Sequence, residues 1–68
     1  MKNKLKIERA INDLTQAQLA DKVQVSRQTI NAIELGKYVP STLLSLKIAK
    51  IFKKPVDEVF ELEDEDWK

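Results

Sequence analysis

The segment from residue 27 to residue 31 carries hydrogen-bonding side chains at a spacing that suits one exposed face of a helix. Its polar members are Arg27, Gln28, Thr29 and Asn31. At about 100° per residue, Ile30 and Ile33 define the buried direction, and the polar side chains lie opposite it or on its flanks. Gln and Asn can bond adenine bidentately, Arg can bond guanine, and Thr can contact the thymine methyl. The segment therefore has the side chains needed to read base edges, although a merely solvated helix face would contain similar residues.

The composition argues against catalysis and metal binding. The chain contains no His and no Cys, so the commonest general base, the thiol nucleophile and the usual zinc ligands are missing. It also lacks a Gly-rich phosphate loop and a paired-carboxylate pocket. We therefore expect no enzyme, no metal and no cofactor.

Length and charge point to a small domain with an anionic partner. The 68 residues bury a limited core and have no disulfide to support it, so a homodimer is expected on structural grounds. Residues 1–54 hold 11 Lys or Arg against 4 Asp or Glu, whereas residues 55–68 hold 1 against 7. The basic body suits a polyanion, although scattered surface lysines would give a similar balance. No targeting segment or membrane-length apolar run is present, so we expect a cytoplasmic protein without a membrane partner.

The sequence predicts an all-α fold of five helices. A first helix is expected from about Leu5 to Asn12, with Ile7 and Ile11 as an i,i+4 apolar pair. Thr15 and Gln18 form a capping box for a second helix over about 16–23, and Ser26 caps a third that ends before Gly36.

The second half of the chain continues the helical pattern. Ser41 caps a fourth helix that is apolar around most of its circumference, as expected for a central, buried helix. Pro55 begins a short fifth helix. The extreme N-terminus and residues 60–63 could each form a short strand instead, which allows a short terminal β-hairpin. We assign residues 1–62 to one domain, with a helix-turn-helix at about 15–35, and residues 63–68 to a mobile acidic tail containing Trp67.

Two parts of this unit are suited to hold phosphate. The N-terminus of the second helix, at Thr15 and Gln16, presents free backbone N–H groups and a positive dipole end. Lys37 and Tyr38 follow the third helix and are placed to contact a neighbouring strand. Gln16 could equally be an ordinary helix-start residue, and the ring of Tyr38 could pack against the fourth helix.

A family resemblance covers nearly the whole chain. The residues that carry it are Thr15-Gln16, Leu19-Ala20, Val25-Ser26-Arg27-Gln28-Thr29-Ile30-Asn31, Ile33-Glu34, Gly36-Lys37-Tyr38 and Pro40. This pattern resembles the phage repressor and Cro type of helix-turn-helix protein, called Xre-like, and in particular its small stand-alone regulators such as the cytolysin repressor. The resemblance implies a transcriptional regulator that binds double-stranded DNA, with repression the favoured output. An adaptor or antitoxin-like component that reuses the fold to bind a protein is the alternative.

The resemblance also implies roles for single residues. Arg27 and Gln28 are expected to read bases. The residues that flank them are expected to contact base edges or the DNA backbone, and they are Thr29, Asn31, Lys37 and Tyr38. Gln16 is expected to bond a phosphate and brace Gln28. A buried ion pair is implied between Arg9 and Glu34, and the position of Glu34 at the edge of the inward helix face supports it. The dimer contact is expected at Val56, Val59, Phe60 and Leu62, although these are also plausible core residues.

Four positions depart from the family pattern, one of them Leu35, which is apolar where a polar residue is common. Position 24 is often Gly, so Gln24 would be strained if the turn requires a left-handed residue. Position 8 is often apolar, and we interpret Glu8 as surface variation. Ala32 stands where a longer base-reading side chain is found in some relatives, which concentrates base contacts at Arg27 and Gln28.

Overall fold

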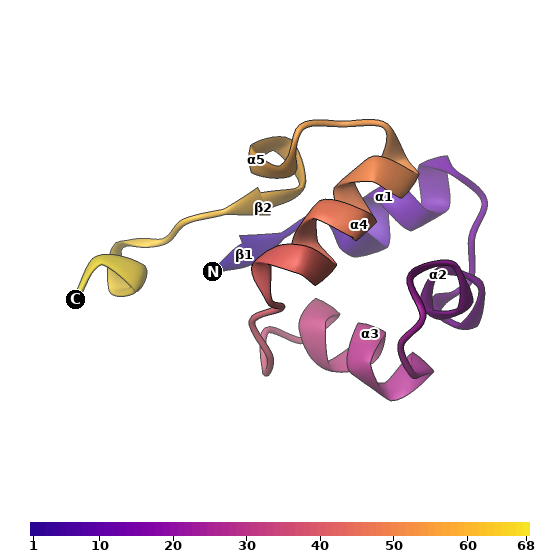
Figure 1. Cartoon of the computed structure of the whole chain (residues 1–68). Helices are drawn as coiled ribbons and strands as arrows, with labels where there is room; N and C mark the ends of the chain where they lie inside the picture. The colour runs from indigo at the N-terminus through magenta and orange to yellow at the C-terminus, as the bar shows by residue number, and fades with distance from the viewer.

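Helix α4 (Thr42–Phe52) lies at the centre of the structure, a computed structural model that describes residues 1–68 (Figure 1). The other helices pack around it. They are α1 (Leu5–Ile11), α2 (Gln16–Val23), α3 (Arg27–Glu34) and α5 (Val56–Val59). The structure has the five helices that were predicted, and α2 has the predicted bounds. The predicted all-α, repressor-like architecture is therefore confirmed. None of the helices has the length and apolar character needed to cross a lipid bilayer.

A short two-stranded antiparallel sheet joins the two ends of the helical body. Strand β1 (Lys2–Asn3) pairs with β2 (Phe60–Glu61), with Lys2 opposite Glu61 and Asn3 opposite Phe60. Both short terminal strands that the sequence allowed are therefore present, although they pair across the chain as a two-stranded sheet and not as a hairpin. Asn3 also donates from Nδ2 to the backbone oxygen of Ile33 at 2.8 Å, so the sheet is tied to the C-terminal end of α3.

The predicted caps form as expected. Thr15, Ser26 and Ser41 each accept a hydrogen bond from the backbone three residues on, and Gln18 completes the capping box of α2 by accepting from the Thr15 N–H at 2.8 Å. Gly36 has φ of 75°, the left-handed conformation that ends α3. These local bonds fix where the helices begin and end before any tertiary contact is considered.

The core is a single apolar cluster contributed by all five helices and β2. Its fully or nearly fully buried members are Leu5, Leu19, Ala20, Val23, Ile30, Ile33, Leu44, Ile48, Ala49, Phe52, Val59 and Phe60. Ala20 on α2 is small enough for α3 to cross closely over it. This packing fixes the relative orientation of α2 and α3, on which the candidate site depends.

Helix α1 faces the core differently from the prediction. Ile7 and Ile11 are 60% and 66% exposed, whereas Leu5 and Glu8 point inward. The reading of Glu8 as a surface residue is also wrong, because its side chain is only 4% exposed and its Oε2 accepts from Lys54 Nζ at 2.6 Å. An i,i+4 apolar pair in a seven-residue helix is too little signal to decide which face is buried.

Two further differences concern α4 and the C-terminal tail. Leu43 and Leu46 are more than half exposed, so α4 is buried on one side rather than around most of its circumference. The tail, expected to be mobile, forms a 3-10 turn, η1 (Asp64–Trp67), that extends away from the helical body (Figure 1).

Polar contacts hold this turn. The Glu63 backbone N–H donates to Asp66 Oδ2 at 2.7 Å and lowers the pKa of that carboxyl. The α-amino group of Met1 lies 3.1 Å from the same oxygen, whereas Trp67 is largely exposed.

Candidate nucleic-acid interface

The turn between α2 and α3 places the two helices in the geometry of a helix-turn-helix. Gln24, the C-cap of α2, has φ of 63° and ψ of 44°, so the left-handed conformation anticipated at this position is present. The Val25 N–H then bonds the Ala20 oxygen at 3.0 Å, and Ser26 starts α3 two residues after Gln24. A left-handed residue lets the chain reverse within this short span.

The outward face of α3 carries the residues predicted to read bases, but they differ in availability. Arg27 and Gln28 are exposed, and Gln28 makes no side-chain hydrogen bond within the chain. Thr29 is half-buried, and its hydroxyl lies 3.0 Å from the Ser26 hydroxyl at the helix cap. Asn31 is half-buried and accepts a hydrogen bond from α2. Arg27 and Gln28 are therefore the most accessible of the four.

The ion pair expected between α1 and α3 is present in the structure. Arg9 Nε donates to Glu34 Oε2 at 2.6 Å, and Arg9 Nη2 donates to Glu34 Oε1 at 3.1 Å. Arg9 Nη1 also donates to the Leu14 oxygen at 3.0 Å. The hydrogen bond to Glu34 raises the pKa of Arg9, and burial of the guanidinium opposes that shift only in part. This bidentate pair ties the C-terminal end of α3 to α1.

Gln16 extends the ion pair toward the exposed face of α3. Its Nε2 donates to Glu34 Oε1 at 3.2 Å and to Asn31 Oδ1 at 3.1 Å, while its Oε1 accepts from Arg27 Nη1 at 3.4 Å. The expectation that Gln16 braces Gln28 is therefore wrong, because the bonds go to Asn31 and Arg27. A one-turn spacing on α3 places Asn31 and Glu34 together opposite the first residue of α2, and sequence reasoning missed this contact.

Both residues of the loop after α3 that were predicted to contact the DNA backbone are exposed to solvent. Lys37 and Tyr38 are exposed, and Lys37 makes no ion pair. Tyr38 lines a shallow depression with Leu43 and Leu44 of α4. The ring is therefore close to α4, as the structural alternative proposed, while remaining 46% exposed.

The comparisons with known proteins agree with this geometry. The helix-turn-helix family model matches residues 5–59, from the first residue of α1 to the last of α5. The chain belongs to the Xre/Cro-like helix-turn-helix family. An uncharacterized HTH-type transcriptional regulator of Methanocaldococcus jannaschii is 56% identical over 66 residues, which cover 97% of this chain and 100% of the relative. One of Bacillus subtilis is 52% identical with the same coverage, and one of Archaeoglobus fulgidus is 39% identical over 100% of this chain and 97% of the relative. As a member of this family, the chain is a DNA-binding transcriptional regulator.

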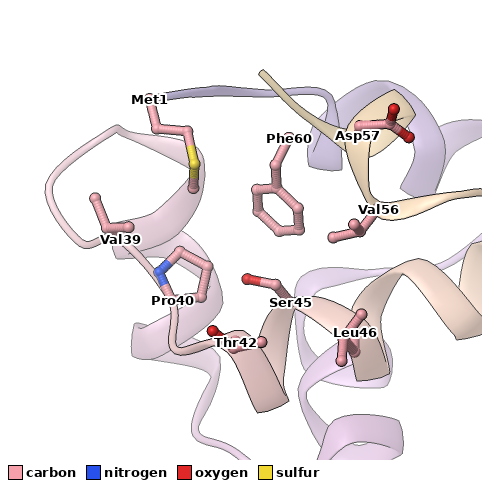
Figure 2. Close-up of a pocket in the computed structure, with 9 residues that line it drawn as sticks. All are labelled: Met1, Val39, Pro40, Thr42, Ser45, Leu46, Val56, Asp57 and Phe60. Carbon is pink, nitrogen blue, oxygen red and sulfur yellow. The ribbon is translucent and has the colours of Figure 1, made fainter. Parts of the chain in front are cut away.

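The four residues expected at a dimer contact differ in their burial. Val59 and Phe60 belong to the core of the single chain, whereas Val56 is half-buried and Leu62 is 59% exposed. Val56 and Phe60 line a surface pocket of about 320 Å³ together with Pro40 and Leu46 (Figure 2). The exposed apolar surface around this pocket includes residues from the α3–α4 loop and α4 that the sequence analysis did not select.

Proposed function

We propose that this regulator represses transcription by binding a palindromic operator as a homodimer, with one α3 in the major groove of each half-site. The observation that carries the proposal is the exposed pair Arg27 and Gln28 on a helix whose position is fixed by the Arg9–Glu34 ion pair. A recognition element must be rigid to discriminate bases, because misplacement of a side chain forfeits bidentate hydrogen bonds. Thr29 and Asn31 would act beside this pair on the same helix.

Phosphate contacts would come from the two ends of the helix-turn-helix. At the start of α2, both amide hydrogens of the Gln16 side chain are used within the protein, so its phosphate contact would be made by the backbone N–H. The hydroxyl of Thr15 accepts from the Gln18 N–H and keeps its own hydrogen for a phosphate. Lys37 and Tyr38, in the loop after α3, would contact phosphates of the DNA backbone. Such contacts orient the protein without reading sequence.

The surface around the Figure 2 pocket supports dimerisation. In that view the Phe60 ring lies between Pro40 on one side and Val56 on the other. Leu46 is 52% exposed beside it. A second copy that covers this surface would bury apolar area that a single small domain leaves in water. Two recognition helices related by a two-fold axis would then reach half-sites about one helical turn, ~34 Å, apart. A dimer of that span bound over a promoter would occlude it.

Selection of bound sequences from a random pool of duplex DNA tests the proposal. The expected result is an inverted repeat whose half-site centres are separated by about one helical turn. Fluorescence titration of the selected site at two salt concentrations should show affinity falling steeply with salt, because phosphate contacts release counterions. Absence of enrichment together with salt-insensitive binding would contradict DNA recognition and favour the adaptor or antitoxin-like alternative.

A further inference from the structure

The outer face of α4 carries leucines and lysines side by side. It lies opposite the buried residues of that helix and consists of Leu43, Leu46, Lys47 and Lys50. The two leucines are 67% and 52% exposed, and neither lysine takes part in an ion pair within the chain. Positions three and four apart are neighbours on a helix, so apolar and basic groups are interleaved on this face. It suits a partner segment that offers both an apolar group and a carboxylate.

The C-terminal tail, residues 63–68, has that complementary chemistry. Trp67 is the most exposed of the large apolar side chains, at 77%. Side chains three residues apart in a 3-10 helix lie directly above one another, so Asp64 and Trp67 share one face of η1. The carboxylate of Asp64 makes no ion pair within the chain. The tail therefore presents an indole and a free carboxylate together.

The tail points away from the α4 of its own chain. Its root is held by Glu63 and Asp66, whose carboxylates lie 3.0 and 3.1 Å from the α-amino group of Met1. Figure 1 shows η1 extended to one side of the helical body, with α4 at the centre of that body. The indole of Trp67 is thus left in water, and the outer face of α4 is left uncovered by the tail of the same chain.

The surface proposed for dimerisation connects these two features. Phe60, three residues before the tail, lines the pocket of Figure 2, and Leu46 lines the same pocket from α4. A second copy on this surface therefore brings the outer face of its α4, which begins at Leu46, close to the root of the tail. A tail that extends away from its own body from this point continues along the partner.

We propose that, in the homodimer, the tail of each protomer docks on the outer face of its partner's α4. The indole of Trp67 packs on the two leucines of that face, and the carboxylate of Asp64 lies beside its two lysines. This inference rests on the homodimer of the proposed function and adds a second contact to it. A two-fold axis makes the contact occur twice, once for each tail. The charges select the acidic tail, and burial of the indole supplies apolar contact area.

Trp67 itself reports the contact, because it is the only tryptophan of the chain. In a dilution series, analytical ultracentrifugation measures the dimer fraction, and tryptophan fluorescence measures the exposure of the tail. As the dimer fraction rises, the emission maximum should move to shorter wavelength and quenching by acrylamide should fall. Trp67→Ala should raise the dimer dissociation constant by about tenfold or more, as expected of an aromatic anchor at an interface.

Charge reversal tests the lysines of the α4 face. Lys47→Glu combined with Lys50→Glu should raise the dimer dissociation constant by about tenfold, since attraction to the tail becomes repulsion at two positions. It should also leave the tryptophan exposed at concentrations where the unaltered protein buries it. Asp64→Lys in the same chain should recover part of the affinity. Lys4→Glu combined with Lys6→Glu is the matched control, because both lysines are exposed, lie at or beside α1 and make no ion pair; it should change neither measurement.

The outcomes separate the tail contact from the proposed function. A dimer in which Trp67 stays exposed would overturn the tail contact and leave the homodimer intact. So would equal effects of the α4 pair and the control pair. A short-wavelength emission that does not depend on concentration would place the tail on its own chain, which also overturns the contact. A protein that stays monomeric at every concentration, free and on the selected DNA, would instead contradict the homodimer of the proposed function.

Discussion

Two buried carboxylates on different helices should respond in opposite ways to replacement by leucine. Glu8 and Glu34 each pair with a basic side chain at 2.6 Å, and neither is appreciably exposed. The two carboxylates differ in how many of their oxygens accept a hydrogen bond. Both oxygens of Glu34 accept hydrogen bonds, whereas Glu8 Oε1 is buried without any partner. The partners differ as well, because the Lys54 side chain is 39% exposed and that of Arg9 is 15% exposed.

These differences determine the expected sign for each variant. Glu8→Leu removes an unsatisfied buried oxygen, which costs about 1–3 kcal/mol, and leaves Lys54 free to turn into water. We expect a gain in the free energy of unfolding of about 1–3 kcal/mol, since replacement of a buried ion pair by apolar groups is often stabilising. Glu34→Leu instead leaves the Arg9 charge buried and unpaired, at a cost of about 3–5 kcal/mol.

Thermal and urea unfolding of the two variants measure the effect. In a domain of this size each kcal/mol shifts Tm by roughly 4–8 °C, so Glu8→Leu should raise Tm and Glu34→Leu should lower it by more than about 12 °C. A Tm for Glu8→Leu below that of the unaltered protein, or shifts of the same sign for both variants, would refute the reasoning. Arg9→Met combined with Glu34→Leu should recover much of the loss of the single Glu34 variant, because no charge is then left unpaired.

Three further substitutions separate the roles of neighbouring residues. Gln24→Gly relieves the strain of the left-handed conformation and should raise the free energy of unfolding by about 0.5–1 kcal/mol, after the added freedom of the unfolded chain is subtracted. Lys22→Gly, within the same helix, should instead destabilise the fold. An unchanged or lowered Tm for Gln24→Gly would contradict strain at the turn. Arg27→Ala should cost about 1–3 kcal/mol on the selected operator and relax discrimination, and equal losses on operator and random DNA in titrations would exclude base reading there. Lys37→Ala should weaken binding to all duplexes alike and reduce the salt slope by about one unit, so a loss confined to the operator would show that Lys37 reads sequence instead.

The helix-turn-helix could be predicted closely because its determinants are local. Thr15, Ser26 and Ser41 cap the helices that follow them, and Gly36 and Gln24 adopt the left-handed conformations that their positions predict. Each of these signals involves residues within about one turn of each other. Local hydrogen bonds survive in most tertiary contexts, so reading them from sequence was sufficient.

The errors lie where the deciding contact joins distant parts of the chain. Glu8 is buried because Lys54, 46 residues away, reaches it, and nothing near Glu8 in the sequence indicates that partner. The same holds for Gln16, whose partners on α3 depend on the crossing of two helices rather than on spacing along one. The hydrogen-bond partners of amide and carboxylate side chains depend on how the helices are arranged in space. Their roles therefore follow from the tertiary structure and not from the sequence alone.

Stability and base specificity depend on different parts of one connected network. The Arg9–Glu34 pair supports the fold, since removing either partner leaves a buried charge. Gln16 is half-buried and donates two hydrogen bonds, to Glu34 and to Asn31, outside the apolar core. Glu34→Leu should therefore reduce both stability and discrimination, whereas Gln16→Met should alter discrimination with little change in Tm. If the Gln16 variant lost as much stability as the Glu34 variant, any change in base preference would reflect a displaced α3 rather than the loss of the hydrogen bonds to Asn31 and Arg27.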